Sequence, residues 1–136
     1  MLVIDASAVL ELALRRPIAS ALEAHLLEDG IDLHAPQLLD VEVLSALRRL
    51  VIARDASAAR ADEAVTDLLD LPIERYPHDV LVPRAWELRE NFSAHDAVYL
   101  ALAEALRDSG ARLLTTDGRL ARAVLAHSEV DVILVG

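Results

Sequence analysis

Two acidic residues directly follow apolar runs of the kind that form buried strands. Asp5 follows residues 2–4 (Leu-Val-Ile), and Asp117 follows residues 113–116 (Leu-Leu-Thr-Thr). If both runs are parallel strands, the two carboxylates lie at the carboxyl ends of the strands, where ligands bind in α/β sheets. Asp117 could instead cap a helix or begin an Asp-Gly turn. Asp5 is harder to explain in structural terms, because an acid that closes a buried strand needs a partner.

Two further acids interrupt apolar segments that are predicted to be helical. Glu42 lies within residues 38–44, which are otherwise strongly apolar apart from one aspartate. Asp96 precedes residues 97–103, which are apolar nearly all round and therefore predict a buried helix. Structural roles remain open for both acids. Asp96 stands three residues after Ser93, which is the spacing of a capping box, and Glu42 could lie on a partly wet face and pair with an arginine.

Four carboxylates that converge on one region repel one another strongly. Each pair of like charges about 4 Å apart costs about 4 kcal/mol at an effective dielectric constant of about 20. Either some of the acids stay protonated, or a cation lies among them. A hard divalent ion with oxygen ligands, Mg²⁺ or Mn²⁺, suits such a set. The sequence therefore predicts a metal site made by Asp5, Glu42, Asp96 and Asp117.

Short strand-like runs alternate with longer helical ones along the chain. Strands are predicted at residues 2–5, 32–34, 73–76, 112–115 and 130–135, and helices at 7–14, 17–28, 36–53, 57–70, 80–91, 94–107 and 118–126. Ser7 and Ser57 are expected to cap their helices, and Asp29-Gly30 to close the second one. Strands separated by helices form a mostly parallel central sheet flanked by helices on both faces. The predicted fold class is therefore α/β, in a single domain over residues 1–136.

Composition excludes several classes of function. The formal net charge is −10 and aromatic residues make up 3%, so neither a broad basic surface nor a stacking platform is available to bind nucleic acid. Any nucleic-acid function must come from a local site. The chain has no cysteine, which excludes thiolate metal sites and cysteine nucleophiles.

The absence of lysine and the identity of residue 7 argue against two further classes of protein. The chain has no lysine, which a phospho-acceptor receiver domain would need near its phosphorylated acid. Ser7 stands where a haloacid-dehalogenase-type phosphatase would have a second aspartate. The first residues do not form a signal peptide and no run of about 18 apolar residues occurs, so we expect a cytoplasmic protein without a membrane span.

Five segments match a known pattern in order along essentially the whole chain. They are residues 5–9 (Asp-Ala-Ser-Ala-Val), 35–43 (Ala-Pro-Gln-Leu-Leu-Asp-Val-Glu-Val), 71–74 (Leu-Pro-Ile-Glu), 93–103 (Ser-Ala-His-Asp-Ala-Val-Tyr-Leu-Ala-Leu-Ala) and 114–120 (Leu-Thr-Thr-Asp-Gly-Arg-Leu). The chain resembles the PIN-domain proteins. Its size and the order of its motifs resemble the VapC-type toxins of bacterial type II toxin–antitoxin pairs. No single motif is specific, but five motifs in this order and at this spacing are strong evidence for the resemblance.

The resemblance implies a PIN fold and a Mg²⁺-dependent endoribonuclease, with Mn²⁺ as a second suitable ion. It also implies a VapB-type antitoxin as partner, an RNA substrate and a toxin homodimer. Carried over by motif, the catalytic and metal-binding residues are Asp5, Glu42, Asp96 and Asp117, with Thr115 and Thr116 as accessory residues. Asp5 and Asp96 are the most dependable ligands, whereas the fourth acid varies more in such families and could act through water.

Two other functions remain open from the residues alone. A non-catalytic binding module of the same fold would be expected to have lost some of the acids, and all four are present. A DNA-directed nuclease of related fold could use the same ligands, because metal ligands do not recognise the sugar. The short chain favours RNA.

Arginines near the acids are the candidates for contact with RNA, namely Arg15, Arg16, Arg48, Arg49, Arg119 and Arg122. Arg49 lies two turns after Glu42 on the same predicted helix face. For most of these arginines a structural role is the simpler explanation, such as complementing the dipole at a helix end. His95 adjoins Asp96 and is expected to be solvated, and the remaining histidines lack the close spacing of a zinc site.

Overall fold

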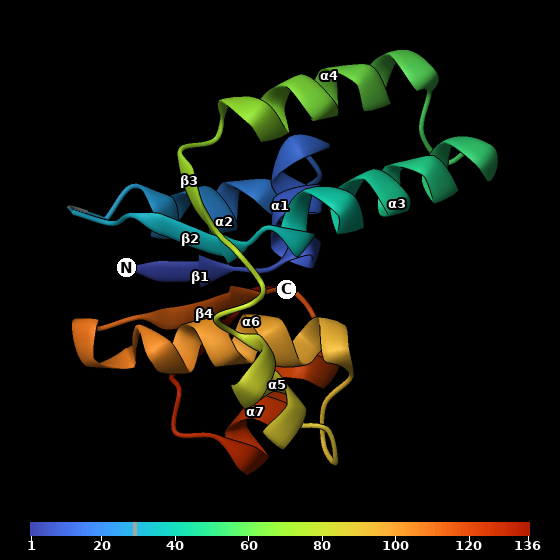
Figure 1. Ribbon diagram of the computed structural model, residues 1–136. Helices are drawn as coiled ribbons and strands as arrows, with labels where there is room; N and C mark the ends of the chain where they lie inside the picture. The colour runs from blue at the N-terminus through green and yellow to red at the C-terminus, as the bar shows by residue number, and fades with distance from the viewer. Residues whose placement is uncertain (29) are drawn as a thin grey trace.

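The central feature of the computed structural model, which describes residues 1–28 and 30–136, is a parallel sheet with the strand order β3-β2-β1-β4-β5 (Figure 1). Its strands are β1 (Leu2–Ile4), β2 (Leu33–Pro36), β3 (Ile73–Tyr76), β4 (Arg112–Thr115) and β5 (Val132–Leu134). All four strand pairs are parallel. The first strand is therefore central, which places Asp5, the residue after β1, at the middle of the carboxyl edge.

The direction in which successive connections cross the sheet explains which helices cover which of its faces. The helices are α1 (Ala6–Ala13), α2 (Ala19–Leu26), α3 (Leu38–Ile52), α4 (Ala58–Asp70), α5 (Val82–Glu87), α6 (Ala94–Ala105) and α7 (Gly118–His127), with a 3₁₀ turn at Arg107–Ser109. Parallel crossovers are right-handed. The connections from β1 to β3 run one way across the sheet and those from β3 to β5 run the other way, so α1–α4 lie on one face and α5–α7 on the other (Figure 1). This arrangement confirms the predicted α/β fold.

The apolar runs of the sequence form the core. Residues 2–4 and 113–114 are completely buried, as expected for central strands packed on both faces. Helix α6 packs against β1, β2 and β4, and its residues 97–103 are all buried. Burying this helix on all sides fixes the position of its first turn, which carries Asp96. Among the described residues no helix has the length and apolar character needed to cross a membrane.

The boundaries differ from the sequence-based predictions at the first connection. Strand β1 ends at Ile4, and Asp5 is the N-cap of α1, where its side chain accepts a hydrogen bond from the Ala8 backbone N–H. The prediction that Ser7 caps this helix is wrong. Aspartate caps as well as serine does, and the helix follows the strand so closely that Asp5 is the only residue between them. Ser57 caps α4, as predicted.

Two other helix boundaries also differ. Pro36 ends β2, and α3 begins at Leu38, because proline at this position pairs with Tyr76 as part of the sheet. Helix α2 ends at Leu26, and the predicted stop at Asp29-Gly30 falls partly outside the described residues, because Asp29 is not among them.

Candidate functional site

Asp5 is buried at the carboxyl end of β1, with 5% of its surface exposed. Its Oδ1 accepts hydrogen bonds from Ser7 Oγ at 2.7 Å and from the Ala8 backbone nitrogen at 3.0 Å, and its Oδ2 accepts one from Thr115 Oγ1 at 2.6 Å. Burial raises the pKa of Asp5, these hydrogen bonds oppose the increase, and the nearby charge of Asp117 adds to it. The carboxyl group is thus held firmly in a place where its negative charge is unfavourable.

Two hydroxyl groups join the carboxyl ends of β1 and β4. Thr115 is completely buried, and its Oγ1 accepts a hydrogen bond from the Asp117 backbone nitrogen at 3.0 Å while it donates to Asp5. Ser7 Oγ accepts from the Thr116 backbone nitrogen at 3.2 Å. Thr115 therefore contributes its side chain to the site, whereas Thr116 contributes its backbone.

Asp96 and Asp117 share one arginine. Arg119 Nη2 lies 2.9 Å from Asp96 Oδ2 and 3.2 Å from Asp117 Oδ2. The predicted cap holds for Asp117, whose Oδ1 accepts from the nitrogens of Arg119 and Leu120. At Asp96 only half of the predicted capping box is seen, because the Ser93 hydroxyl accepts from the Asp96 nitrogen and the Asp96 carboxylate pairs with Arg119 instead. The Oδ2 atoms of both acids therefore face a single cation. The hydrogen bond with Asp96 is the main cause that raises the pKa of Arg119.

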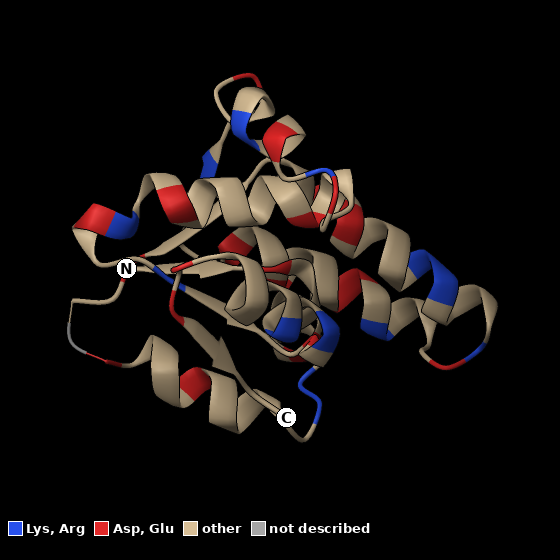
Figure 2. Ribbon diagram, turned by 90° about the horizontal axis from the view of Figure 1, so that it is seen from below, with Lys and Arg blue, Asp and Glu red and all other residues tan. Residues whose placement is uncertain are grey.

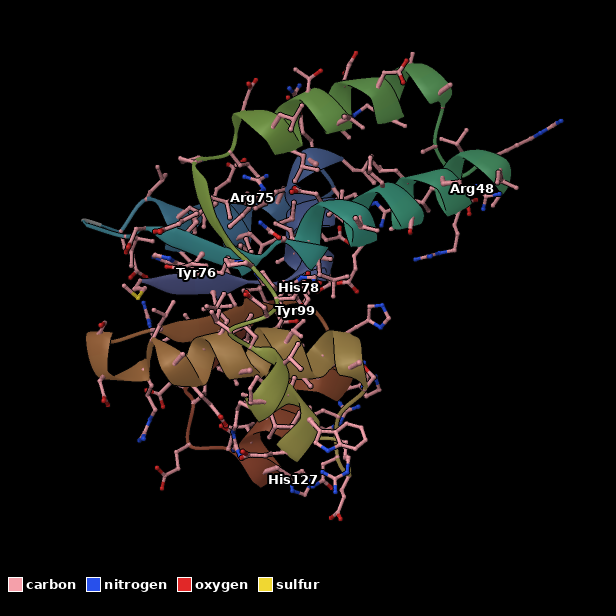
Figure 3. The ribbon with its side chains drawn as sticks, in the orientation of Figure 1. Arg48, Arg75, Tyr76, His78, Tyr99 and His127 are labelled. Carbon is pink, nitrogen blue, oxygen red and sulfur yellow. The ribbon has the colours of Figure 1, made fainter. Side chains whose placement is uncertain are left out.

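Glu42 lies on α3 and lines a cavity next to the first turn of α6. Its Oε1 and the Tyr99 hydroxyl are both buried, and neither has a hydrogen-bond partner among the described residues. Tyr99 lies on α6, one turn after Asp96 (Figure 3). Burial raises the pKa of Tyr99, and the charges of Glu42 and then Asp5 add to this increase, although the hydroxyl and Glu42 do not form a hydrogen bond. The expectation that Glu42 pairs with an arginine is not met among the described ion pairs.

Three of the four acids are linked at the carboxyl edge, and the fourth lies on the adjoining cavity. Asp5 and Asp117 influence each other by charge, Asp117 and Asp96 share Arg119, and Glu42 lines a cavity with His95, the neighbour of Asp96. Their catalytic and metal-binding roles remain predictions. His95 is exposed, as expected. The sequence-based prediction missed Tyr99, whose only signal was a hydroxyl group within an otherwise apolar helix.

The donor set fits a hard divalent ion. Within residues 1–28 and 30–136 no three His, Cys, Asp or Glu side chains are arranged to hold a metal ion, and Arg119 pairs with two of the four acids. The site nevertheless combines carboxylate oxygens with an unpartnered buried Glu42 Oε1 and a buried Asp5 whose charge needs compensation. The Arg119 side chain is 66% exposed, so it can move away without disturbing the core.

Replacing Tyr99 by phenylalanine is expected to raise the free energy of unfolding by about 1 kcal/mol, because it removes a buried hydroxyl that has no partner. The matched control is Tyr76→Phe, which removes a hydroxyl that lies 2.6 Å from His34 Nδ1 and should lower stability by about 1 kcal/mol. Urea denaturation of both variants measures these changes. A loss of stability in Tyr99→Phe would show instead that its hydroxyl does bind Glu42.

The fold and the site define a class of protein, an α/β domain that gathers carboxylates at the carboxyl ends of parallel strands. The family profile described as the PIN domain matches residues 2–124. Ribonuclease VapC12 of Mycobacterium tuberculosis is 38% identical over 133 residues, which cover 98% of this chain and 99% of that protein. Ribonuclease VapC9 of the same organism is 40% identical over 133 residues, or 98% of each chain. This chain therefore belongs to the PIN-domain family, within its VapC group.

Two solved structures share the fold. Mycobacterium tuberculosis VapC20, described as a Sarcin-Ricin loop cleaving toxin, has a TM-score of 0.65 at 17% identity and covers 90% of this chain and 95% of its own. PAE2754 from Pyrobaculum aerophilum has a TM-score of 0.62 at 20% identity and covers 96% of this chain and 81% of its own. At these identities the likeness supports the fold, and it confirms the predicted PIN-like architecture.

Proposed function

We propose that this chain is a Mg²⁺-dependent endoribonuclease and the toxin of a type II toxin–antitoxin pair, with residues 1–136 acting as one PIN domain. The observation that carries the proposal is the set of links among the acids: Asp5 and Asp117 interact by charge, Asp96 and Asp117 share Arg119, and Glu42 lines the adjoining cavity. Proteins that are 38% and 40% identical over nearly the whole chain are named ribonucleases, which supports the same activity here.

The site residues would have separate roles in RNA cleavage. A bound Mg²⁺ ion supplies Lewis-acid stabilisation of the phosphate and a water of lowered pKa. Asp5 and Asp96 would hold this ion, and Asp117 would assist through water. Glu42 Oε1, which is buried and unpartnered, would accept a hydrogen bond from the attacking water and align it with the phosphorus. Thr115 keeps the Asp5 carboxylate in one orientation. In-line attack leaves a 5′-phosphate and a 3′-hydroxyl.

The same proposal includes the partners and the place of action. A VapB-type antitoxin would hold the toxin inactive, and the toxin would form a homodimer. Cellular RNA is the substrate, so the enzyme would act in the cytoplasm. Membership of the VapC group supports the antitoxin partner and the RNA substrate.

The test is expression of the chain without an antitoxin in a bacterial host, followed by mapping of new RNA ends that carry a 5′-phosphate. We expect discrete cuts with the wild type and none with folded Asp96→Asn protein. Purified protein is then incubated with an intact RNA that contains a mapped cleavage site and, separately, with DNA of the same sequence. Cleavage of DNA alone would favour a DNA-directed nuclease, and a folded protein that cleaves neither would favour a binding module.

Mg²⁺ is expected to raise the melting temperature of the chelator-treated wild type, but not that of Asp5→Asn. A ligand that binds only the folded state stabilises it by about 2.7 kcal/mol at about 100 times its dissociation constant. The metal-free protein should also depend on pH. Because burial raises the pKa of Asp5, the folded state holds this proton more tightly than the unfolded chain does. The stability contributed by Asp5 is therefore complete below the ordinary pKa of 3.8 and is lost as the pH rises through the folded value.

Differential scanning fluorimetry measures both effects. The melting temperature is compared with and without added Mg²⁺, and that of the metal-free protein is followed as the pH rises from below 3.8. The Asp5→Asn variant should lose the part of the pH dependence that comes from residue 5, because its amide does not titrate. Equal stabilisation of both proteins by Mg²⁺ would contradict the assignment of Asp5 as a metal ligand.

A further inference from the structure

Arginines without a carboxylate partner are concentrated on α3. Eight of the thirteen arginines form ion pairs, namely Arg15, Arg16, Arg60, Arg75, Arg84, Arg107, Arg112 and Arg119. Among the described residues, five arginines have no such partner, and three of these five lie on α3 or directly after it: Arg48, Arg49 and Arg54. Acidic and basic positions are otherwise interspersed in the view of Figure 2. In a chain with a net charge of −10, these are cations that no carboxylate of the described residues neutralises.

Arg49 lines a cavity that is also lined by Glu42, one of the four acids of the site. A cavity of about 400 Å³ is lined by Glu42, Ser45 and Arg49 of α3 and by His95 of α6, together with two apolar residues. Glu42, Ser45 and Arg49 follow one another at intervals of three and four residues, which places them on one helix face. Seven residues correspond to about 10 Å along a helix axis. Arg49 is therefore beside the acidic site without pairing with Glu42.

The chemistry of this cavity suits a phosphodiester. Four carboxylates repel the backbone of RNA, so the substrate needs a cation close to the acids but separate from them. A guanidinium group binds a phosphate through two parallel hydrogen bonds, and the Ser45 hydroxyl can donate a further one. We propose that Arg49 and Ser45 form a subsite for an RNA phosphate that neighbours the reacting one. This inference rests on the proposed ribonuclease function and assigns the substrate-binding side of that site.

Arg48 provides a matched control. It is the next residue along the chain, it is exposed, and it has no carboxylate partner among the described residues. However, Arg48 lines a different cavity, an apolar cleft between α3 and α4, with Leu47 and Val51 among its neighbours. Figure 3 shows Arg48 on the C-terminal part of α3. Arg48→Ala and Arg49→Ala change the net charge equally, so any difference between them reports position rather than overall charge.

The experiment compares wild type, Arg49→Ala, Arg49→Lys and Arg48→Ala in two assays. Steady-state cleavage is measured with the RNA identified by end mapping, and binding of a fluorescein-labelled copy of that RNA is measured by anisotropy in chelator at several salt concentrations. We expect Arg49→Ala to raise KM about tenfold with kcat changed less than about twofold. Its slope of log affinity against log salt should fall in magnitude by about 0.7, the contribution of one phosphate contact. Arg49→Lys should restore most of the slope but less of the affinity.

The outcomes are distinguishable. If Arg48→Ala and Arg49→Ala behave alike in both assays, the subsite is not at Arg49 and this inference fails, while the ribonuclease proposal stands. If the wild type binds RNA and loses affinity through Arg49→Ala but does not cleave, the subsite holds and the proposed activity fails. If the folded wild type neither binds nor cleaves any RNA, including total cellular RNA, both are overturned.

Discussion

Replacing Asp5 by asparagine is expected to reduce RNA cleavage by at least about 10³-fold without unfolding the protein. The Asn side-chain oxygen can still accept hydrogen bonds from Ser7 and the Ala8 nitrogen, so the cap of α1 survives. The Thr115 hydroxyl can rotate and accept from the new amide instead of donating to a carboxylate. What the variant loses is the negative charge at the centre of the carboxyl edge, and with it a ligand for Mg²⁺.

The control for this prediction is Asp62→Asn, which makes the same change of charge at an exposed position on α4. It should cleave at the wild-type rate. Circular dichroism and melting temperature in chelator verify that both variants fold. Cleavage by Asp5→Asn within about tenfold of the wild type would mean that the reaction does not depend on this carboxylate, and the metal mechanism would then be wrong.

The strands and their mostly parallel arrangement could be predicted from features that are local in the sequence, whereas the strand order β3-β2-β1-β4-β5 is not predicted by them. The central strands β1 and β4 contain short apolar runs between helical segments. Residues 97–103 are apolar nearly all round, which allows α6 to be buried against three strands. Asp5 and Asp117 can be placed at strand ends from their neighbours alone. The N-cap role of Asp5 could not be derived in that way, because it depends on how closely α1 follows β1.

The contacts between elements are not visible in the sequence. Spacing places Arg49 on the face of Glu42, but it cannot show that the two do not pair. Arg119 is a candidate for RNA contact in the sequence, whereas the structure pairs it with Asp96 of α6 and with Asp117, the N-cap of its own helix α7. The pairing with Asp96 joins side chains from separate helices, so a pattern along the chain identifies such groups but not their partners.

Thr115 and Thr116 are equivalent candidates in the sequence, and the structure separates them. Thr115→Val is expected to lower the free energy of unfolding by about 2–4 kcal/mol, because the buried hydroxyl donates to Asp5 and accepts from the Asp117 nitrogen. Valine keeps the shape but satisfies neither group. Cleavage should fall about 10- to 100-fold, the usual cost of removing a residue that orients a metal ligand.

Thr116→Val makes the same chemical change one residue later and should alter stability by less than about 0.5 kcal/mol, because only the Thr116 backbone nitrogen takes part in the network. Thr115→Ser keeps the hydroxyl and should recover most of the cleavage rate. Chemical denaturation and cleavage kinetics are measured on all three variants. Equal losses in Thr115→Val and Thr116→Val would show that the apolar packing of this strand end matters rather than the hydroxyl. Recovery of the cleavage rate in Thr115→Ser would show that the loss in Thr115→Val comes from the missing hydrogen bond that orients Asp5.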